Sequence, residues 1–131
     1  MRIAPAFFAS LALLAAAGEA IAAPLPPAAR AEVNALLNRL QASGCEFNRN
    51  GSWYTGAEAK AHLLKKLDYL EGKDMVQTPE QFIERGASDS SMSGKPYLVR
   101  CAGSKAPVES AQWLKAELQT VRAMRAASSP R

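Results

Sequence analysis

The feature that most constrains the fold of this chain is its pair of cysteines, Cys45 and Cys101. A bond between them would close a loop of about 57 residues, and the chain-entropy model gives such a bond roughly 4 kcal/mol of stabilisation. Disulfides persist only in oxidising compartments, where a lone pair of thiols in a small domain favours a disulfide over a metal or redox site. If the chain is exported, we therefore expect Cys45 to be bonded to Cys101.

Residues 1–22 have the features of a secretory signal peptide. Arg2 gives a positive start, residues 3–17 form an apolar run, and Ala20-Ile21-Ala22 supplies the small residues that a signal peptidase recognises. The apolar run is about fifteen residues, shorter than the roughly 20 needed to span a bilayer. We predict cleavage near Ala22, export to the periplasm and a mature chain without a transmembrane segment.

The mature chain, residues 23–131, has the length of one domain with a modest core. The formal net charge is +4, and Lys65-Lys66 is the only adjacent pair of basic residues. Nucleic-acid binders concentrate basic residues with aromatics, so this dispersed charge argues against a nucleic-acid partner. With one histidine, and with both cysteines in a disulfide, a transition-metal site lacks ligands, and no cofactor is expected.

Turn residues and apolar spacing predict the first half of the domain. Apolar residues over 33–40 recur on one helical face, and Gly44 is a suitable helix end. Within 45–54, Asn50-Gly51 lies between aromatic-rich runs and predicts a hairpin with a type I′ turn. The later elements, in chain order, are a helix from near Gly56 to near Gly72, a short helix from Thr78-Pro79, a polar loop over 86–95, a strand over 97–101, and a helix from near Pro107 whose tail frays from Ala126.

This order predicts a small single α+β domain, helix–hairpin–helix–helix–strand–helix, in which helices pack a small antiparallel sheet. Cys45 opens the first strand and Cys101 closes the last one. Antiparallel pairing of those strands would place the two cysteines opposite each other. We therefore predict one cross-strand disulfide.

Four segments carry a resemblance to a known family: FNRNGSWY at 47–54, AKAHLLKKLDYL at 59–70, TPEQFIERGASDSSMSGKPYLVRC at 78–101 and WL at 113–114. Together they resemble an uncharacterised family of small exported bacterial proteins, a domain of unknown function. The resemblance covers nearly all of the mature chain and implies bacteria with two membranes, hence the periplasm. It implies no established activity.

The polar loop is the most distinctive segment. Small side chains let backbone N–H groups approach an anion, to which Lys95 adds charge. The alternative is a loop whose hydroxyl groups satisfy backbone groups and helix ends. The loop lacks the spacing of a phosphate-binding P-loop. The candidate binding residues that it contributes are Ser90, Ser91, Ser93, Gly94 and Lys95.

Four residues outside that loop are also candidates. His62, the only histidine, could act as the base for a loop serine, or it could be a packed, hydrogen-bonded residue. Arg49 is available to pair with a carboxylate such as Glu58 or Asp89, or to bind an acidic ligand, whereas turn geometry alone explains its neighbour Asn50. Tyr97, with Trp53 and Tyr54, suits either an aromatic binding face or the core.

These residues support three hypotheses of function. The first is a non-enzymatic module of the periplasm that binds an unidentified envelope ligand or protein through the Arg49 hairpin and the loop over 90–95. The second is an envelope hydrolase or transferase that uses a loop serine with His62. The third is a structural or stress-related envelope protein. No complete catalytic constellation is present in the sequence, which favours the first hypothesis.

Overall fold

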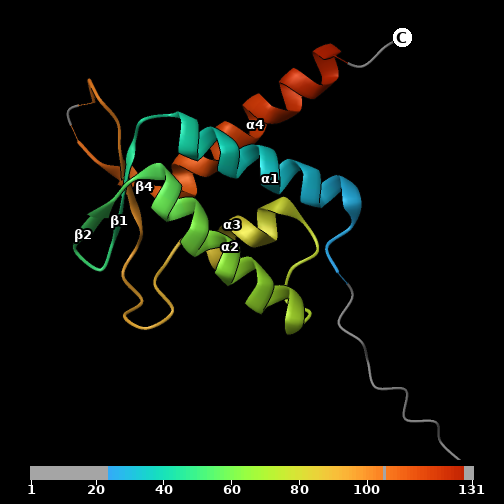
Figure 1. The fold of residues 1–131 in the computed structure, drawn as a ribbon, viewed down its shortest axis with the longest axis horizontal. Helices are drawn as coiled ribbons and strands as arrows, with labels where there is room; N and C mark the ends of the chain where they lie inside the picture. The colour runs from blue at the N-terminus through green and yellow to red at the C-terminus, as the bar shows by residue number, and fades with distance from the viewer. Residues whose placement is uncertain (1–23, 105, 129–131) are drawn as a thin grey trace, which may run out of the picture.

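A computed structural model describes residues 24–104 and 106–128, so the predicted signal peptide lies outside the described residues. They form helices and an antiparallel sheet, and the sheet lies at one end of the packed helices (Figure 1). This confirms the predicted α+β domain. The elements are α1 (Pro27–Ala42), β1 (Glu46–Arg49), β2 (Ser52–Tyr54), α2 (Gly56–Gly72), α3 (Pro79–Gly86), β3 (Leu98–Arg100), β4 (Val108–Glu109) and α4 (Ser110–Ser128).

The helix α2 begins where the sequence predicted. The Thr55 hydroxyl accepts a hydrogen bond from the Glu58 N–H, and the Glu58 carboxylate accepts from the Thr55 N–H, which completes a capping box. Gly56 then lets the start of α2 approach α1 closely, because a Cβ at this position would lie 2.6 Å from the carbonyl oxygen of Leu40. This contact fixes how α2 crosses α1, and α2 carries two residues of the site described below.

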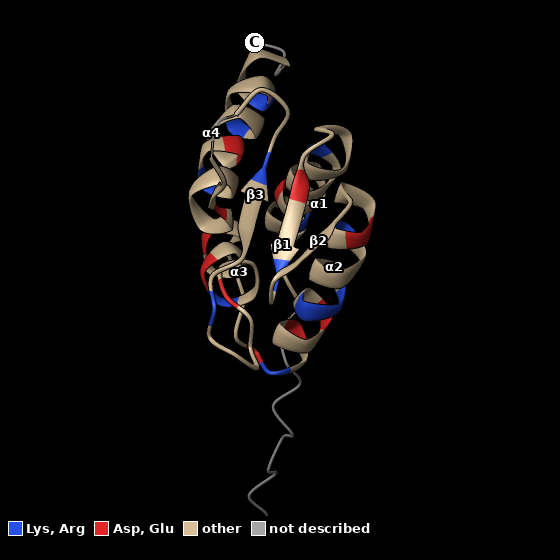
Figure 2. Ribbon diagram, turned by 90° about the vertical axis from the view of Figure 1, so that its left-hand side faces the viewer, with Lys and Arg blue, Asp and Glu red and all other residues tan. Residues whose placement is uncertain are grey.

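The strands form one sheet in the order β2-β1-β3-β4, with every neighbouring pair antiparallel. The β1–β2 turn has positive φ at both central residues, 52° at Asn50 and 86° at Gly51, as the predicted type I′ turn requires. Phe47 and Val99 pair across β1 and β3 and are buried. In Figure 2 no helix lies in front of β1 and β3, so the helices cover only the opposite face of these strands.

The predicted disulfide joins Cys45 to Cys101, with an S–S distance of 2.01 Å and a Cα–Cα distance of 4.2 Å. The neighbouring pair Glu46 and Arg100 is in register between β1 and β3, so the bond is cross-strand as expected. The bond therefore holds together the two central strands, β1 and β3. Arg49 is the last residue of β1, and Tyr97 directly precedes β3.

The last helix differs from the prediction. It begins at Ser110 instead of near Pro107, because Val108 and Glu109 form the short strand β4, in which Val108 pairs with Val99. The Ser110 N–H donates to the carbonyl oxygen of Tyr97 at 2.8 Å, which extends this pairing into the helix start. Residues 126–128, where fraying is expected, are part of this helix, and 129–131 lie outside the described residues.

The core lies among the four helices and the inner face of the sheet. Among the residues that the structure describes, no helix is both long and apolar enough to cross a membrane. Large side chains buried in the core include Leu36, Leu37, Leu40, Phe47, Leu63, Leu67, Phe82, Ile83, Tyr97, Leu114 and Leu118.

Candidate functional site

Four polar side chains from different parts of the chain meet at one end of the domain. Arg49 ends β1, His62 and Lys66 lie one turn apart on α2, and Tyr97 directly precedes β3. A spacing of four residues places His62 and Lys66 on the same helical face. The pairing of β1 with β3 brings Arg49 near Tyr97, which is 99% buried and packs its ring against Phe47.

These four side chains form one hydrogen-bonded chain. Arg49 Nη1 lies 2.8 Å from His62 Nδ1, and His62 Nε2 lies 3.2 Å from the Tyr97 hydroxyl. Lys66 Nζ donates to the same hydroxyl at 3.0 Å and to the backbone carbonyl of Asp89 at 2.9 Å. Contacts with aromatic rings support both cations, since the Arg49 guanidinium lies 4.9 Å from the ring centre of Tyr54 and Lys66 Nζ lies 4.8 Å from that of Tyr97.

Burial and like charges shift the pKa values of these groups. Burial lowers the pKa of His62 to about 4, and the nearby positive charges of Arg49, Lys66 and Lys65 act in the same direction. Burial also lowers the pKa of the Lys66 ammonium, although Asp89 opposes this effect. The pKa of the Tyr97 phenol is raised by burial. At neutral pH the imidazole and the phenol are therefore both uncharged.

The chain of side chains borders a small cavity of about 140 Å³, which we call the His62 pocket. Its other wall comes from the start of the polar loop, where Ser90 is buried and Ser91 and Met92 are exposed. The Ser90 hydroxyl accepts hydrogen bonds from the N–H groups of Met92 and Ser93, each at 3.3 Å, and so holds the loop turn. The His62 pocket is lined by Arg49, Asn50, His62, Lys66, Ser90, Ser91, Met92 and Tyr97.

The structure thus brings six of the nine predicted binding residues to one cavity: Arg49, Asn50, His62, Ser90, Ser91 and Tyr97. The remaining three, Ser93, Gly94 and Lys95, do not line it. Ser93 instead donates to the Asn50 side-chain oxygen at 2.6 Å, and Gly94 has a φ of 70° in the turn. Lys95 lines a separate hollow, shared with Asn50 on the outer side of the hairpin.

Of the two alternatives for Arg49, the structure does not show pairing with a carboxylate. Among the described residues Arg49 forms no salt bridge with Glu58 or Asp89, and it contacts His62 and Tyr54 instead. The carboxylate of Glu58 is occupied in the cap of α2, where it accepts from Thr55. Glu58, the acidic residue near Arg49 in the sequence, therefore caps α2 and does not pair with Arg49.

Lys66 is the residue that sequence reasoning missed. The pair Lys65-Lys66 was considered only as a sign of charge density, whereas Lys66 lies four residues after His62 and so shares its helical face. That spacing was a usable signal. What the sequence did not contain was the position of Tyr97, whose hydroxyl joins His62 to Lys66.

The geometry does not favour a catalytic pair of His62 with a loop serine. Both ring nitrogens of His62 already have partners, Arg49 and Tyr97, and none of the hydrogen bonds of the described residues joins His62 to a loop serine. Within the same part of the chain, no group of three or more His, Cys, Asp and Glu side chains is placed to hold a metal ion. The groups that face the pocket are therefore suited to hold a ligand by hydrogen bonds and charge.

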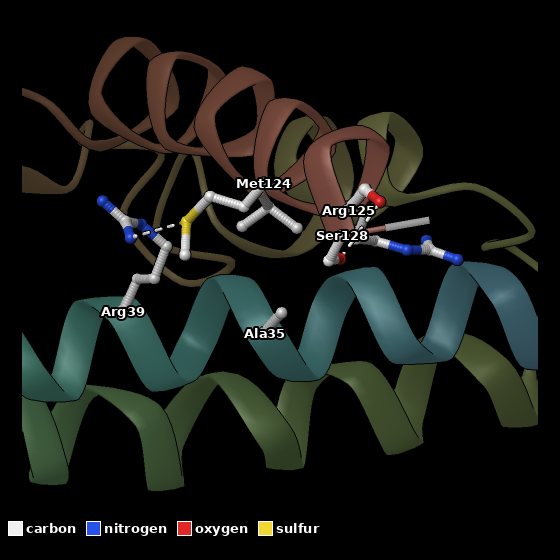
Figure 3. A pocket seen from close by; sticks show the side chains of 6 residues that line it. Ala35, Arg39, Met124, Arg125 and Ser128 are labelled. Atoms are coloured by element: carbon white, nitrogen blue, oxygen red, sulfur yellow. Dashed lines mark hydrogen bonds between the residues drawn. The ribbon is translucent and has the colours of Figure 1, made fainter. Parts of the chain in front are cut away.

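A larger hollow, of about 330 Å³, lies between α1 and the second half of α4 (Figure 3). Arg39 and Met124 approach each other across it, with 3.5 Å between Arg39 Nη1 and the sulfur. Arg39 also pairs with Glu117 at 2.5 Å, so its charge is compensated. This groove is mainly apolar, and its two arginines, Arg39 and Arg125, are paired with Glu117 and Glu32, which makes the smaller His62 pocket the better candidate.

Comparison with known proteins identifies the family. A profile described as a family of unknown function (DUF5329) matches residues 27–122. The chain belongs to this family. It is also 44% identical over 68 residues to an uncharacterised protein, YfeK, of Salmonella typhimurium, and this match covers 51% of the chain and 55% of the relative. The matched segment thus spans about half of each protein, and no solved structure matches the chain.

Proposed function

We propose that this protein is exported to the periplasm and acts there as a non-enzymatic module that binds a small polar ligand in the His62 pocket. The observation that carries the proposal is the convergence of Arg49 and Lys66 on one cavity without a carboxylate partner among the described residues. Partly buried charge without an ion-paired carboxylate costs stability and is typical of a place where a ligand completes the charge balance.

Export is supported by two features of the chain. Residues 1–22 have the composition of a cleavable signal peptide, and the Cys45–Cys101 disulfide requires an oxidising compartment to persist. The test is expression of the full chain in a bacterium with two membranes, followed by osmotic shock and mass spectrometry. We expect a released protein that starts at Ala23 and carries an intact disulfide. A cytoplasmic protein that keeps residues 1–22 would refute export.

The hydrolase alternative has weaker support from the same site. A general base needs a free ring nitrogen within reach of the hydroxyl that it deprotonates, whereas both nitrogens of His62 are bonded to Arg49 and Tyr97. The low pKa of His62, about 4, would also make it a weak base. The other alternative is a structural role without a ligand, and the binding experiment distinguishes it from ligand binding in the His62 pocket.

The binding test uses the mature, oxidised protein labelled with ¹⁵N. The small-molecule fraction of a cell-envelope extract is titrated into it, and amide shifts are followed by NMR. We expect shifts concentrated at Arg49, His62, Ser91 and Tyr97. They should be lost in Lys66→Ala and retained in Lys115→Ala, which removes the same charge from an exposed position on α4. Shifts absent from the pocket, or equal in both variants, would refute binding at this site.

A further inference from the structure

We infer that Arg49, His62, Lys66 and Tyr97 present only hydrogen-bond donors to the His62 pocket, and that its ligand group is therefore a deprotonated oxyanion such as a carboxylate, sulfate or phosphate. This inference rests on the proposed binding function and adds the chemical class of the ligand. It follows from the direction of each hydrogen bond in the chain of four side chains.

The direction is fixed at one end by Arg49. A guanidinium can only donate, so His62 Nδ1, 2.8 Å away, must be the acceptor. A neutral imidazole carries a single N–H, which must then be on Nε2. His62 Nε2 therefore donates to the Tyr97 hydroxyl oxygen, 3.2 Å away. The arginine thus sets the tautomer of the histidine.

Lys66 fixes the direction at the other end. An ammonium group also can only donate, and Lys66 Nζ lies 3.0 Å from the same hydroxyl oxygen. The two lone pairs of that oxygen thus accept from His62 and Lys66. Its own proton finds no acceptor among the hydrogen bonds of the described residues, and the cavity lies beside Tyr97. Tyr97 is therefore left with one donor for a ligand.

The two cations beside the cavity have further donors that point to the same kind of ligand. Arg49 has N–H groups beyond the one bonded to His62, and Lys66 has three ammonium protons, of which the Tyr97 hydroxyl and the Asp89 carbonyl take two. Hydrogen bonds in which the donor or the acceptor is ionised are roughly twice as strong as neutral ones. A ligand with an N–H donor in place of an acceptor oxygen would place donor against donor. The small volume, about 140 Å³, limits the recognised part to about one such group.

The first test compares acetate with acetamide. The two have the same shape, but acetamide has a donor NH₂ group where acetate has a second acceptor oxygen. We expect NMR titration to give acetate an at least about tenfold lower Kd than acetamide. Sulfate and phosphate should compete with acetate, and the relative affinities of the three anions identify which oxyanion the pocket prefers. Equal binding of acetamide, or a preference for it, would overturn the oxyanion class while leaving the binding function intact. Absence of any pocket shift with all probes and with the envelope extract would instead refute the binding function.

A second measurement tests the donor chain without a ligand. The ¹⁵N shifts of the His62 ring should show the Nε2–H tautomer at neutral pH, and an Nδ1–H tautomer would overturn the inference. Tyr97→Phe keeps the ring and removes the donor, so acetate affinity should fall about tenfold or more. Tyr69→Phe is the matched control, because Tyr69 is a 64% exposed tyrosine of the same helix as Lys66, and it should leave affinity unchanged. Unchanged acetate affinity in Tyr97→Phe would also overturn the inference.

Discussion

Cations at the two ends of this protein differ in the groups that they contact. Where α1, α2, α3 and α4 pack together, arginines face carboxylates: Arg30 pairs with Glu71, Arg39 with Glu117, and Arg122 with Glu32 and Glu80. At the His62 pocket, Arg49 and Lys66 face an imidazole, a phenol and a backbone carbonyl instead. These three arginines therefore have carboxylate partners, and the two cations of the pocket have none among the ion pairs of the described residues.

This difference separates structural charge from charge available for a ligand. Exposed and half-buried ion pairs contribute little, but they leave no partly buried charge without a partner. A cation held beside a cavity by groups that cannot carry negative charge at neutral pH keeps its attraction for an anion. The charge pattern, more than the size of the hollow, distinguishes the His62 pocket from the groove between α1 and α4.

The largest effect should come from the disulfide, which holds the pocket end and not the helical end. Replacing both cysteines, Cys45→Ser with Cys101→Ser, should lower the free energy of unfolding by about 4 kcal/mol, measured by urea denaturation. Hydrogen exchange should accelerate more in β1 and β3 than in the helices, because the bond joins those two strands. Equal acceleration throughout would show that the two ends unfold as one unit.

Much of the pocket end was predictable because local rules determined it. The Asn50-Gly51 turn, the capping box of Thr55 and the pairing of Cys45 with Cys101 each depend on residues whose local chemistry permits few alternatives. The short strand β4 was missed, because two residues carry no periodic signal and form a strand only beside β3. The contact of His62 with Tyr97 was equally unpredictable, since it joins positions 35 residues apart through tertiary packing.

A pair of methionine substitutions compares the two kinds of cation directly. Arg122→Met removes the partner of Glu80 and one of the two arginine partners of Glu32, and we expect a loss of about 1 kcal/mol in the free energy of unfolding. Lys66→Met removes a partly buried cation that has no carboxylate partner, so we expect a change within about 0.5 kcal/mol. Chemical denaturation of both variants at one pH gives the comparison.

The outcome decides whether Lys66 is structural. Methionine is unbranched, apolar and nearly as long as lysine, so Lys66→Met keeps most of the side-chain volume and removes the contact of Nζ with the Tyr97 ring. A loss in Lys66→Met as large as that in Arg122→Met would mean that the pocket cation holds the fold together. The contrast between the two ends would then disappear.

Acid should weaken the pocket end through His62. Its folded-state pKa, about 4, lies below the ordinary value of 6.5, because of burial and the charges of Arg49, Lys66 and Lys65. Between these values the unfolded chain binds more protons, so stability is complete above about pH 6.5 and declines as the pH falls toward 4. Allowing for solvent screening of this partly exposed group, the loss should be about 1 kcal/mol.

The measurement is the difference between the original chain and His62→Gln across pH 4 to 6.5, by thermal or chemical unfolding. His62 is the only histidine, so the variant removes this titration while leaving the carboxylates in place. Glutamine keeps an acceptor for Arg49 and a donor for Tyr97. A pH dependence that is identical in both proteins would contradict the pKa assigned to His62. The helical end, which contains no histidine, should contribute nothing to the difference.

The smallest effects are expected at the loop serines. They distinguish a serine that stabilises the loop from one that contacts the ligand. Ser91 lines the His62 pocket, is exposed and has no hydrogen bond among those of the described residues, so Ser91→Ala should change the melting temperature very little. Ser93→Ala should lower it measurably, because the Ser93 hydroxyl donates to Asn50 at 2.6 Å and accepts from the Lys95 N–H at 3.2 Å. Only Ser91→Ala should then alter ligand affinity without altering stability. If Ser91→Ala proved the more destabilising of the two, the loop would be a structural element, and the pocket would lose that wall as a recognition surface.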